Sequence, residues 1–319
     1  MVCNLTIICE EKMKFLISTT VILLCAVLMN EALAYNCQAG FNKSELKQFP
    51  EEREYQPGVD AGFDQYKTKS LKNSDKVVLT FDDGPHKTRT PRLLDILKKY
   101  NVKATFFVLT KLVNDSTRPI LERMIKEGHI VATHDHDHDN NNGEDQETFY
   151  NELKTSILII DKLYKKYRPS NKGIFYRFPY GAYGKSETYH HMNVIKTLSY
   201  DLYGENCINF AFWDIDSADW SPKLKDEQIA QNIWAHIKGG TAYKTTMKRS
   251  IFGKVKYKTK KYQHTWPFGG GVALLHDIHD KSIDAAEIFI KKAKAEGVEI
   301  VPLDSVEEYS FKGKTCKID

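Results

Sequence analysis

Short apolar runs alternate with amphipathic segments along most of the chain. The runs KVVLTF (76–81), KATFFVL (103–109) and HIVAT (129–133) are short and mostly apolar, which predicts buried strands. Segments such as TPRLLDILKKY (90–100) and QETFYNELKTSILIIDKLYKKY (146–167) repeat apolar residues every three or four positions, which predicts helices. Strand and helix therefore alternate from the first of these runs onward.

The same alternation continues toward the C-terminus. Further strands are predicted at 173–178, 209–215, 271–276 and 298–303, and further helices at 118–128, 193–200, 226–240 and 283–297. Repeated strand–helix units favour a parallel sheet, and this many units favour an α/β fold with a closed or nearly closed barrel. An active site in such a fold lies at the C-terminal ends of the strands.

The N-terminal segment has the pattern of a secretory signal peptide over residues 1–34. Lys12 and Lys14 precede the apolar run at 15–28, and ALA at 32–34 is typical of a cleavage site. Glu10 and Glu11 suit such a peptide poorly, so we expect translation to start at Met13. The apolar run is shorter than the roughly 20 residues that span a bilayer, which predicts no stable membrane anchor. We expect a secreted or periplasmic protein of the cell envelope.

Cleavage after Ala34 would leave 285 residues, since 319 − 34 = 285. Removing two lysines and three glutamates moves the formal charge from +4 to +5, which favours an anionic envelope or polysaccharide partner. Three cysteines remain in the exported chain. Because domain termini often lie close together, we expect Cys37 to pair with Cys316, with a Cys37–Cys207 pair or three free thiols as the alternatives.

A strongly basic segment occupies residues 243–270. It holds eight Lys or Arg residues and no acid, and the alternation in VKYKTKKY (255–262) predicts a short hairpin at the rim of the barrel. One interpretation is a solubilising charged loop. The other is a basic, aromatic-bearing wall that guides a polyanionic glycan, whose binding would weaken with added salt.

Polar residues gather where the predicted strands end. The five segments are TFDDGPH (80–86), THDHDH (133–138), YRFPYG (176–181), WDIDSADW (213–220) and LLHDIH (274–279). Each alone is compatible with an ordinary turn or loop. Together they place carboxylates, histidines and an arginine at the edge of the barrel where reacting groups meet.

These five segments resemble the motifs of the NodB-homology polysaccharide deacetylases of carbohydrate esterase family four. The resemblance runs from about Lys76 to Leu303 and covers TFDD, a His-x-x-x-His pair, Arg-x-Pro-Tyr, Asp-x-x-Asp-Trp and Leu-x-His. It implies one domain at 76–319, a distorted TIM-like (β/α) barrel with the basic insertion, preceded by an extension at 35–75 that packs on the barrel. It also implies removal of acetyl groups from sugars by a bound metal and an activated water.

The resemblance also implies roles for individual residues. Asp83, His134 and His138 would hold one divalent ion, zinc by preference, with cobalt or manganese as alternatives. Asp82 would be the general base, kept ionised by Arg177, and His276 the general acid, supported by Asp219. The backbone N–H of Tyr180 would hold the oxyanion. Trp220 and Leu274 would line the acetyl pocket. Asp216 shares the strand end with Asp219, and we prefer Asp219 as the partner of His276.

Two residues of the histidine motif depart from the family. Asp135 and Asp139 stand where the family has Ser or Thr and Pro, so we expect extra negative charge near the metal that tightens cation binding or alters metal preference. His136, between the two predicted ligands, is interpreted as a loop residue.

Three functions follow as alternatives. The first is deacetylation of an N-acetylated polysaccharide such as peptidoglycan or a chitin-like glycan. The second is an O-acetyl esterase acting on a substrate such as acetylated xylan. The third is a non-catalytic glycan-binding protein, disfavoured because no residue of the catalytic set is missing. We expect an acetylated polysaccharide as partner, no nucleic acid, and a monomer.

Overall fold

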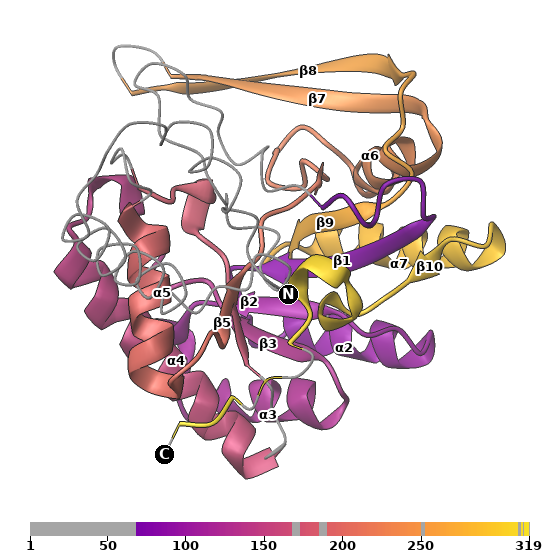
Figure 1. The fold of residues 1–319 in the computed structure, drawn as a ribbon. Coiled ribbons are helices and arrows are strands. Elements are labelled where there is room, and N and C mark those ends of the chain that lie inside the picture. The colour runs from indigo at the N-terminus through magenta and orange to yellow at the C-terminus, as the bar shows by residue number, and fades with distance from the viewer. Residues whose placement is uncertain are drawn as a thin grey trace, which may run out of the picture. The chain divides into compact units, whose positions relative to one another are not determined.

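A computed structural model describes residues 68–167, 173–184, 190–249, 253–311, 314 and 316–318 (Figure 1). The predicted signal peptide and Cys37 lie outside the described residues. Of the predicted extension only 68–75 is described, and there Thr68 donates from its backbone nitrogen to Asp214 Oδ1 at 2.8 Å. Among the described residues, no helix combines the length and the apolar composition needed to cross a membrane.

A parallel sheet forms the centre of the fold, as the sequence predicts. Its hydrogen-bonded order is β5-β4-β3-β2-β1-β9-β6, and β10 pairs with the start of β1. The strands are β1 Lys76–Asp82, β2 Thr105–Val108, β3 Ile130–Thr133, β4 Ile174–Tyr176, β5 Ile208–Phe210, β6 Ile215–Asp216, β9 Gly271–His276 and β10 Glu299–Ile300. The sheet curls into a half-barrel, consistent with a distorted (β/α) barrel, and β5 and β6 are its two edges.

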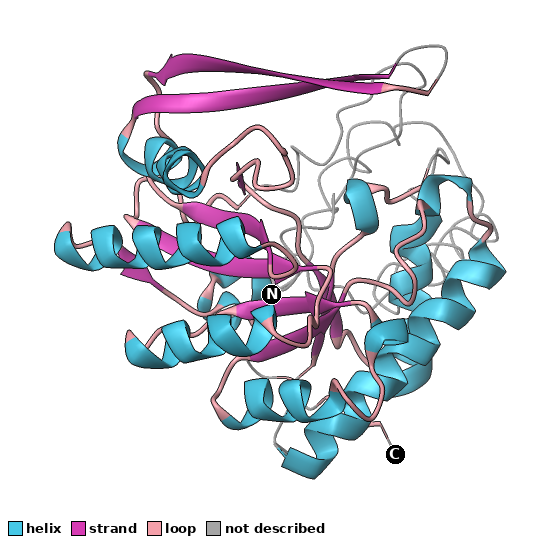
Figure 2. Cartoon of the chain, turned by 180° about the vertical axis from the view of Figure 1, so that it is seen from behind, coloured by secondary structure: helices cyan, strands magenta, loops and turns pink. Residues whose placement is uncertain are grey.

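Helices follow the strands around the sheet (Figure 2). Each packs against the next in the order α6, α7, α2, α3, α4, α5, which matches the order of the strands. In α2 the side chains of Leu93, Leu94 and Leu97 are fully buried, because this spacing places them on one face. The helices are α2 Arg89–Lys99, α3 Arg118–Lys126, α4 Gln146–Tyr167, α5 His190–Tyr203, α6 Asp226–Lys238 and α7 Asp280–Ala295, with short 3₁₀ turns η2 Thr110–Leu112, η3 Asn141–Gly143, η4 Pro179–Gly181, η5 Leu303–Ser305 and η6 Glu307–Tyr309.

The predicted strand at 209–215 is divided into two short strands at opposite edges of the sheet. β5 pairs with β4, whereas β6 pairs with β9. In the link between them, Arg177 donates from Nε to the carbonyl of Ala211 at 2.7 Å and from Nη2 to that of Phe212 at 3.0 Å. A buried guanidinium thus satisfies carbonyl groups that a neighbouring strand would otherwise satisfy.

The basic segment forms a hairpin outside the main sheet, above α6 in Figure 1. Its strands β7 Gly240–Arg249 and β8 Val255–His264 pair antiparallel over ten residues each. A hairpin is therefore confirmed, but it is longer than the predicted VKYKTKKY segment. Gly239 and Gly240 have φ values of 78° and 103°, which lets the chain turn from α6 directly into β7.

The disulfide joins Cys207 to Cys316, with a Cα–Cα distance of 5.5 Å. The predicted Cys37–Cys316 pair is therefore wrong, and so is the alternative Cys37–Cys207 pair. The reason is packing: the C-terminal tail returns to the start of β5, where both cysteines belong to one apolar cluster with Phe175, Tyr309 and Phe311. That cluster brings the two sulfur atoms together across 109 residues of sequence.

Candidate active site

The residues predicted to act together follow the C-terminal ends of neighbouring strands. Asp82 ends β1, and Asp83 comes next with a left-handed φ of 70°. His134 and His138 follow β3, Arg177 follows β4, Asp219 and Trp220 follow β6, Tyr180 lies in η4, and Leu274 and His276 belong to the end of β9. Because the strands are parallel, these ends meet at one edge of the sheet.

Asp83, His134 and His138 form a group with the donor atoms of a metal site. Asp83 Oδ1 lies 3.5 Å from His134 Nε2 and 3.3 Å from His138 Nε2, and one ligand atom from each residue lies within 4.8 Å of the others. Ligands about 2.1 Å from a tetrahedral ion stand about 3.4 Å apart, so these separations fit. Asp83 Oδ1 is also buried without a hydrogen-bond partner, which a bound cation would satisfy.

The orientation of His134 suits metal binding. Its Nδ1 lies 2.8 Å from the carbonyl oxygen of Arg177, which only accepts, so Nδ1 carries the proton. Burial lowers the pKa of His134, so its ring is neutral near pH 7 and Nε2 keeps a lone pair. Burial alone would raise the pKa of the Asp83 carboxyl, but the three histidines beside it lower it. Both residues therefore hold the protonation state of a ligand.

Asp82 is held by a buried arginine. Arg177 is fully buried, and its Nη1 donates to Asp82 Oδ1 at 2.8 Å and to Thr80 Oγ1 at 2.8 Å. Together with the bonds to the two backbone carbonyls beyond β5, all three nitrogen atoms of the guanidinium donate hydrogen bonds. A buried pair with this many hydrogen bonds holds the Asp82 side chain in one orientation.

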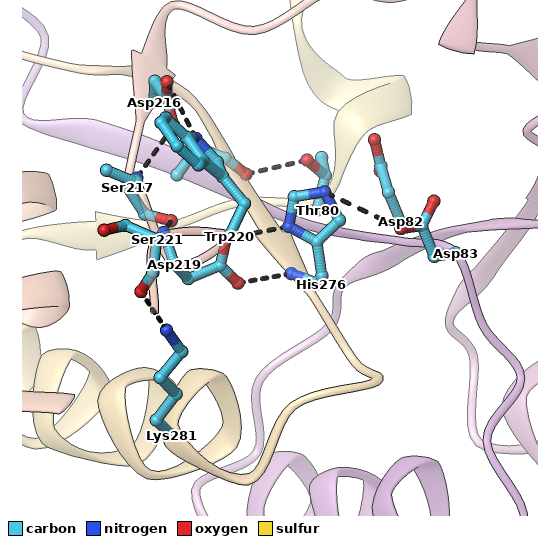
Figure 3. Close-up of polar contacts among 12 residues, drawn as sticks. Thr80, Asp82, Asp83, Asp216, Ser217, Asp219, Trp220, Ser221, His276 and Lys281 are labelled. Carbon is cyan, nitrogen blue, oxygen red and sulfur yellow. Dashed lines mark hydrogen bonds and ion pairs between the residues drawn. The ribbon is translucent and has the colours of Figure 1, made fainter. Parts of the chain in front are cut away.

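His276 and Asp219 form a second charged pair, and His276 lies between Asp219 and the two aspartates Asp82 and Asp83 (Figure 3). Asp219 accepts from His276 twice at 2.7 Å, once from Nδ1 and once from the backbone nitrogen. Burial would lower the pKa of His276, but the charge of Asp219 and its hydrogen bond, with smaller contributions from the other aspartates, raise it to about 10. The imidazolium is therefore the form present near neutral pH, and its Nε2 faces Asp83 Oδ2 at 4.0 Å.

Tyr180, Trp220 and Leu274 complete the predicted set. Tyr180 is left-handed, with φ 58°, and its ring packs edge-on against His138 with centroids 4.6 Å apart. Trp220 Nε1 donates to Asp216 Oδ1 at 3.2 Å, so Asp216 contacts the tryptophan (Figure 3). Leu274 is buried within β9. The geometry is compatible with the roles predicted for these residues, and the roles remain predictions.

The remaining residues of the histidine motif do not join the Asp83 group. Asp135 is fully buried and accepts from Asn141 Nδ2 at 2.8 Å and from Tyr176 Oη at 3.3 Å. Burial also raises the pKa of Asp135. His136 Nδ1 lies 3.0 Å from Thr110 Oγ1, a contact suited to a loop residue.

Two neighbours of the site were not predicted from the sequence. Thr80 contacts Arg177, and Asp277 is fully buried against Gly84. A Cβ at Gly84 would stand 2.4 Å from Asp277 Oδ1, so only glycine fits directly after the Asp82–Asp83 pair. Burial raises the pKa of Asp277 to about 7. The Asp after the histidine in LLHD is the one signal that could have drawn attention to it.

Comparisons with known proteins agree with this fold. The family model described as polysaccharide deacetylase matches residues 69–203. The peptidoglycan-N-acetylglucosamine deacetylase PgdA of Listeria monocytogenes is 28% identical over 236 residues, which cover 74% of this chain and 39% of that protein. The chain thus spans about two fifths of the length of that relative.

Two solved structures share the fold. Peptidoglycan deacetylase PdaC from Bacillus subtilis has a TM-score of 0.51 and 27% identity, covering 75% of this chain and 91% of that one. A family 4 acetyl xylan esterase from Clostridium thermocellum, in complex with a cobalt ion, has a TM-score of 0.50 and 27% identity, covering 72% and 89%. Residues 69–203 thus match the polysaccharide deacetylase family, and the two solved structures share the fold over most of the chain.

Proposed function

We propose that this protein is a metal-dependent hydrolase that removes acetyl groups from the amide nitrogens of a polysaccharide, either peptidoglycan or a chitin-like glycan. The observation that carries the proposal is that two side chains beside Asp83 suit opposite proton transfers, one as acceptor and one as donor. Asp82 is paired with Arg177 and ready to accept a proton, while His276 is paired with Asp219 and ready to donate one. Hydrolysis of an amide needs both a base and an acid.

Asp83, His134 and His138 would hold the metal, which we propose to be zinc. A carboxylate and two imidazoles suit zinc and also suit cobalt, and the related esterase structure contains a cobalt ion. When bound, such an ion polarises the acetyl carbonyl and makes water more acidic. Three protein ligands would leave coordination positions for water and substrate.

The chain's own side chains would move the protons. Asp82 takes one proton from the attacking water, and the new C–O bond converts the amide carbon to a tetrahedral centre. His276 then gives its Nε2 proton to the leaving nitrogen as the C–N bond breaks, which yields acetate and a free amine. Asp219 stabilises the imidazolium before this transfer, the backbone N–H of Tyr180 binds the oxyanion, and Trp220 and Leu274 surround the methyl group.

The strong support for the protonated form of His276 favours an N-acetyl substrate. A departing amine must be protonated, whereas an alkoxide leaves more readily, so a pKa of about 10 matters more for amide than for ester hydrolysis. The second candidate is O-acetyl ester hydrolysis. It is supported by the likeness to a structure titled as an acetyl xylan esterase.

We also propose that the protein works in the cell envelope. The Listeria and Bacillus relatives are named for peptidoglycan, and the Cys207–Cys316 disulfide fits an oxidising compartment. The signal peptide predicted at 1–34 would deliver it there.

Acetate release from a panel of substrates tests the proposal. The panel contains peptidoglycan, N-acetylated chitooligosaccharides and acetylated xylan, each assayed after chelation and after adding back zinc, cobalt or manganese. We expect release from an N-acetylated substrate that disappears on chelation and returns with zinc. Release from xylan alone would support the esterase, and a metal-loaded protein inactive on every substrate would support glycan binding without turnover.

A further inference from the structure

The β7–β8 hairpin has two chemically different faces. Residues directly opposite each other in an antiparallel pair point to the same side, and successive residues alternate. The register pairs Lys244 with Lys260 and Lys248 with Lys256. Beyond the Ala242–Tyr262 pair, which lies on the same side as the lysines, one face, which we call the outer face, therefore holds Lys244, Thr246, Lys248, Lys256, Lys258 and Lys260, and the other, the inner face, holds Tyr243, Thr245, Met247, Arg249, Val255, Tyr257, Thr259 and Lys261.

The inner face rests on the domain. Thr245 is buried, and its hydroxyl donates to Ser221 Oγ at 2.9 Å, in the loop that follows β6. Thr259, opposite Thr245, lies 3.1 Å from it through their hydroxyl groups. From Lys244 and Lys260 toward the tip of the hairpin, the outer face therefore lies on the side opposite Thr245, whereas nearer the base Ala242, on the same side as the lysines, is fully buried.

The outer face concentrates positive charge. Its five lysines are exposed, and none forms an ion pair with a residue in the described part of the chain. No Asp or Glu occurs between Glu227 and Asp277. Like charges placed directly opposite each other destabilise a strand pair, and here two such pairs stand on either side of the Thr246–Lys258 pair. The arrangement costs stability in isolation, and an anion lying along the face would remove that cost.

The spacing and the neighbours of these lysines indicate a polymer. Residues on one face recur about every 6.8 Å along a strand, so the ladder extends over several charged groups of a ligand. Two exposed aromatic rings lie at the base of the hairpin: Tyr262 is 38% and Trp266 is 87% exposed. Flat rings of this kind offer apolar surface to the faces of sugars, while the lysines offer charge.

We propose that the outer face of the hairpin binds a linear anionic polysaccharide, with the lysines paired to carboxylates carried on successive sugars. This surface would hold the protein on an anionic glycan independently of the acetyl group that the active site hydrolyses. Its binding therefore does not depend on the proposed deacetylation, and the two are tested separately.

Binding of the full chain to polygalacturonate tests the proposal, with fully methyl-esterified polygalacturonate as the matched uncharged polymer. We expect binding to the carboxylate form, weakening steadily between 50 and 300 mM NaCl as the Debye length falls by about 2.4-fold, and none to the ester. Lys248→Gln with Lys256→Gln should weaken binding by about fivefold, since each exposed ion pair contributes modestly.

A variant of equal charge on the inner face is the control. Arg249→Gln with Lys261→Gln removes the same two charges from the same hairpin, and we expect less than a twofold change in binding. Equal losses for the two double variants would overturn the assignment to the outer face. Both variants should keep the parent's melting temperature and its acetate release from a small neutral substrate, which separates this surface from the active site.

Two other polyanions show whether the ligand is a glycan. Duplex DNA of random sequence and phosphatidylglycerol vesicles are titrated at the same salt concentrations. We expect both to bind more weakly than polygalacturonate, because they offer no sugar faces at the spacing of the ladder. Equal or tighter binding of DNA or vesicles, or equal binding of the methyl ester, would overturn the proposal.

Discussion

The candidate active site and the β7–β8 hairpin hold their charged side chains in opposite ways. At the site Asp82, Arg177 and Asp219 are each at most 2% exposed, and each is paired with an opposite charge. On the outer face of the hairpin the lysines are exposed and stand opposite one another. Burial makes pairing compulsory because an isolated buried charge is very costly, whereas water tolerates unpaired lysines. Each charge of the site thus depends on its own partner, whereas the lysines of the hairpin contribute together to one positive surface.

The largest expected effect is at the base. Asp82→Asn should lower turnover by about 10²–10⁴-fold, the usual contribution of general acid–base catalysis, because an amide accepts no proton near neutral pH. Metal content should not change, since the Asp83 group is intact. Asp83→Asn is the control and should lose the metal. Retained activity with full metal occupancy would mean that Asp82 is not the base.

The acid should be revealed by the pH profile. The imidazolium of His276 persists below its pKa of about 10, so the rate should fall on the alkaline limb of the profile as pH rises through that value. A bound cation opposes the charge of Asp83, so it should lower this pKa somewhat. Asp219→Asn should move the limb down toward the ordinary value of about 6.5 and leave the acidic limb in place.

Asp216→Asn is the matched control for that profile. Its carboxylate hydrogen-bonds Trp220 and acts on His276 only through its charge, so the alkaline limb should move far less than in the Asp219 variant. Initial acetate release measured from pH 5 to 10.5 compares the three proteins. If the limbs of the Asp219 variant and the parent coincide, the acid is another group.

The disulfide should affect stability and neither of the two charged regions. Replacing Cys207 and Cys316 together by serine should lower the free energy of unfolding by about 2–4 kcal/mol, because the bond closes a long loop in the unfolded chain. Metal content and polygalacturonate binding should be unchanged. Urea unfolding measures the difference, and a variant as stable as the parent would contradict the role given to this bond.

A smaller effect is expected inside the histidine motif. His136→Ala should reduce the rate by less than tenfold, since its ring contacts Thr110, whereas His134→Ala should lose the metal. Metal content and rate are measured on both proteins. Equal metal loss in the two variants would place His136 among the ligands.

The smallest effect is expected for the stability of the hairpin. Lys248→Gln with Lys256→Gln should leave the free energy of unfolding within about 0.5 kcal/mol of the parent, or raise it slightly, because a like-charge pair is relieved at the surface. Thermal and urea unfolding would both report this. A loss above about 1 kcal/mol would show that these lysines stabilise the fold, contrary to the comparison.

The gathering of the site residues could be predicted from the sequence because it depends on local pattern and one topological rule. Short apolar strands separated by helices must form a parallel sheet, and parallel strands end at a common edge. Residues such as Asp82, His134 and His276 directly follow or end those strands, so their meeting needs no knowledge of side-chain packing. The hairpin followed similarly from the alternation in VKYKTKKY.

Other features were decided only by tertiary packing. Cys316 meets Cys207 because the C-terminal tail packs into the cluster beside β5, and no local pattern encodes that return. The strand predicted at 209–215 is divided because Arg177 donates hydrogen bonds to the two carbonyl groups in its middle. Asp135 lies beside a predicted ligand in sequence, yet it contacts Asn141 and Tyr176. The sequence by itself thus determined which residues stand at the strand ends, while the direction in which each side chain points depended on partners far away in the chain, which only the folded structure brings within hydrogen-bonding distance.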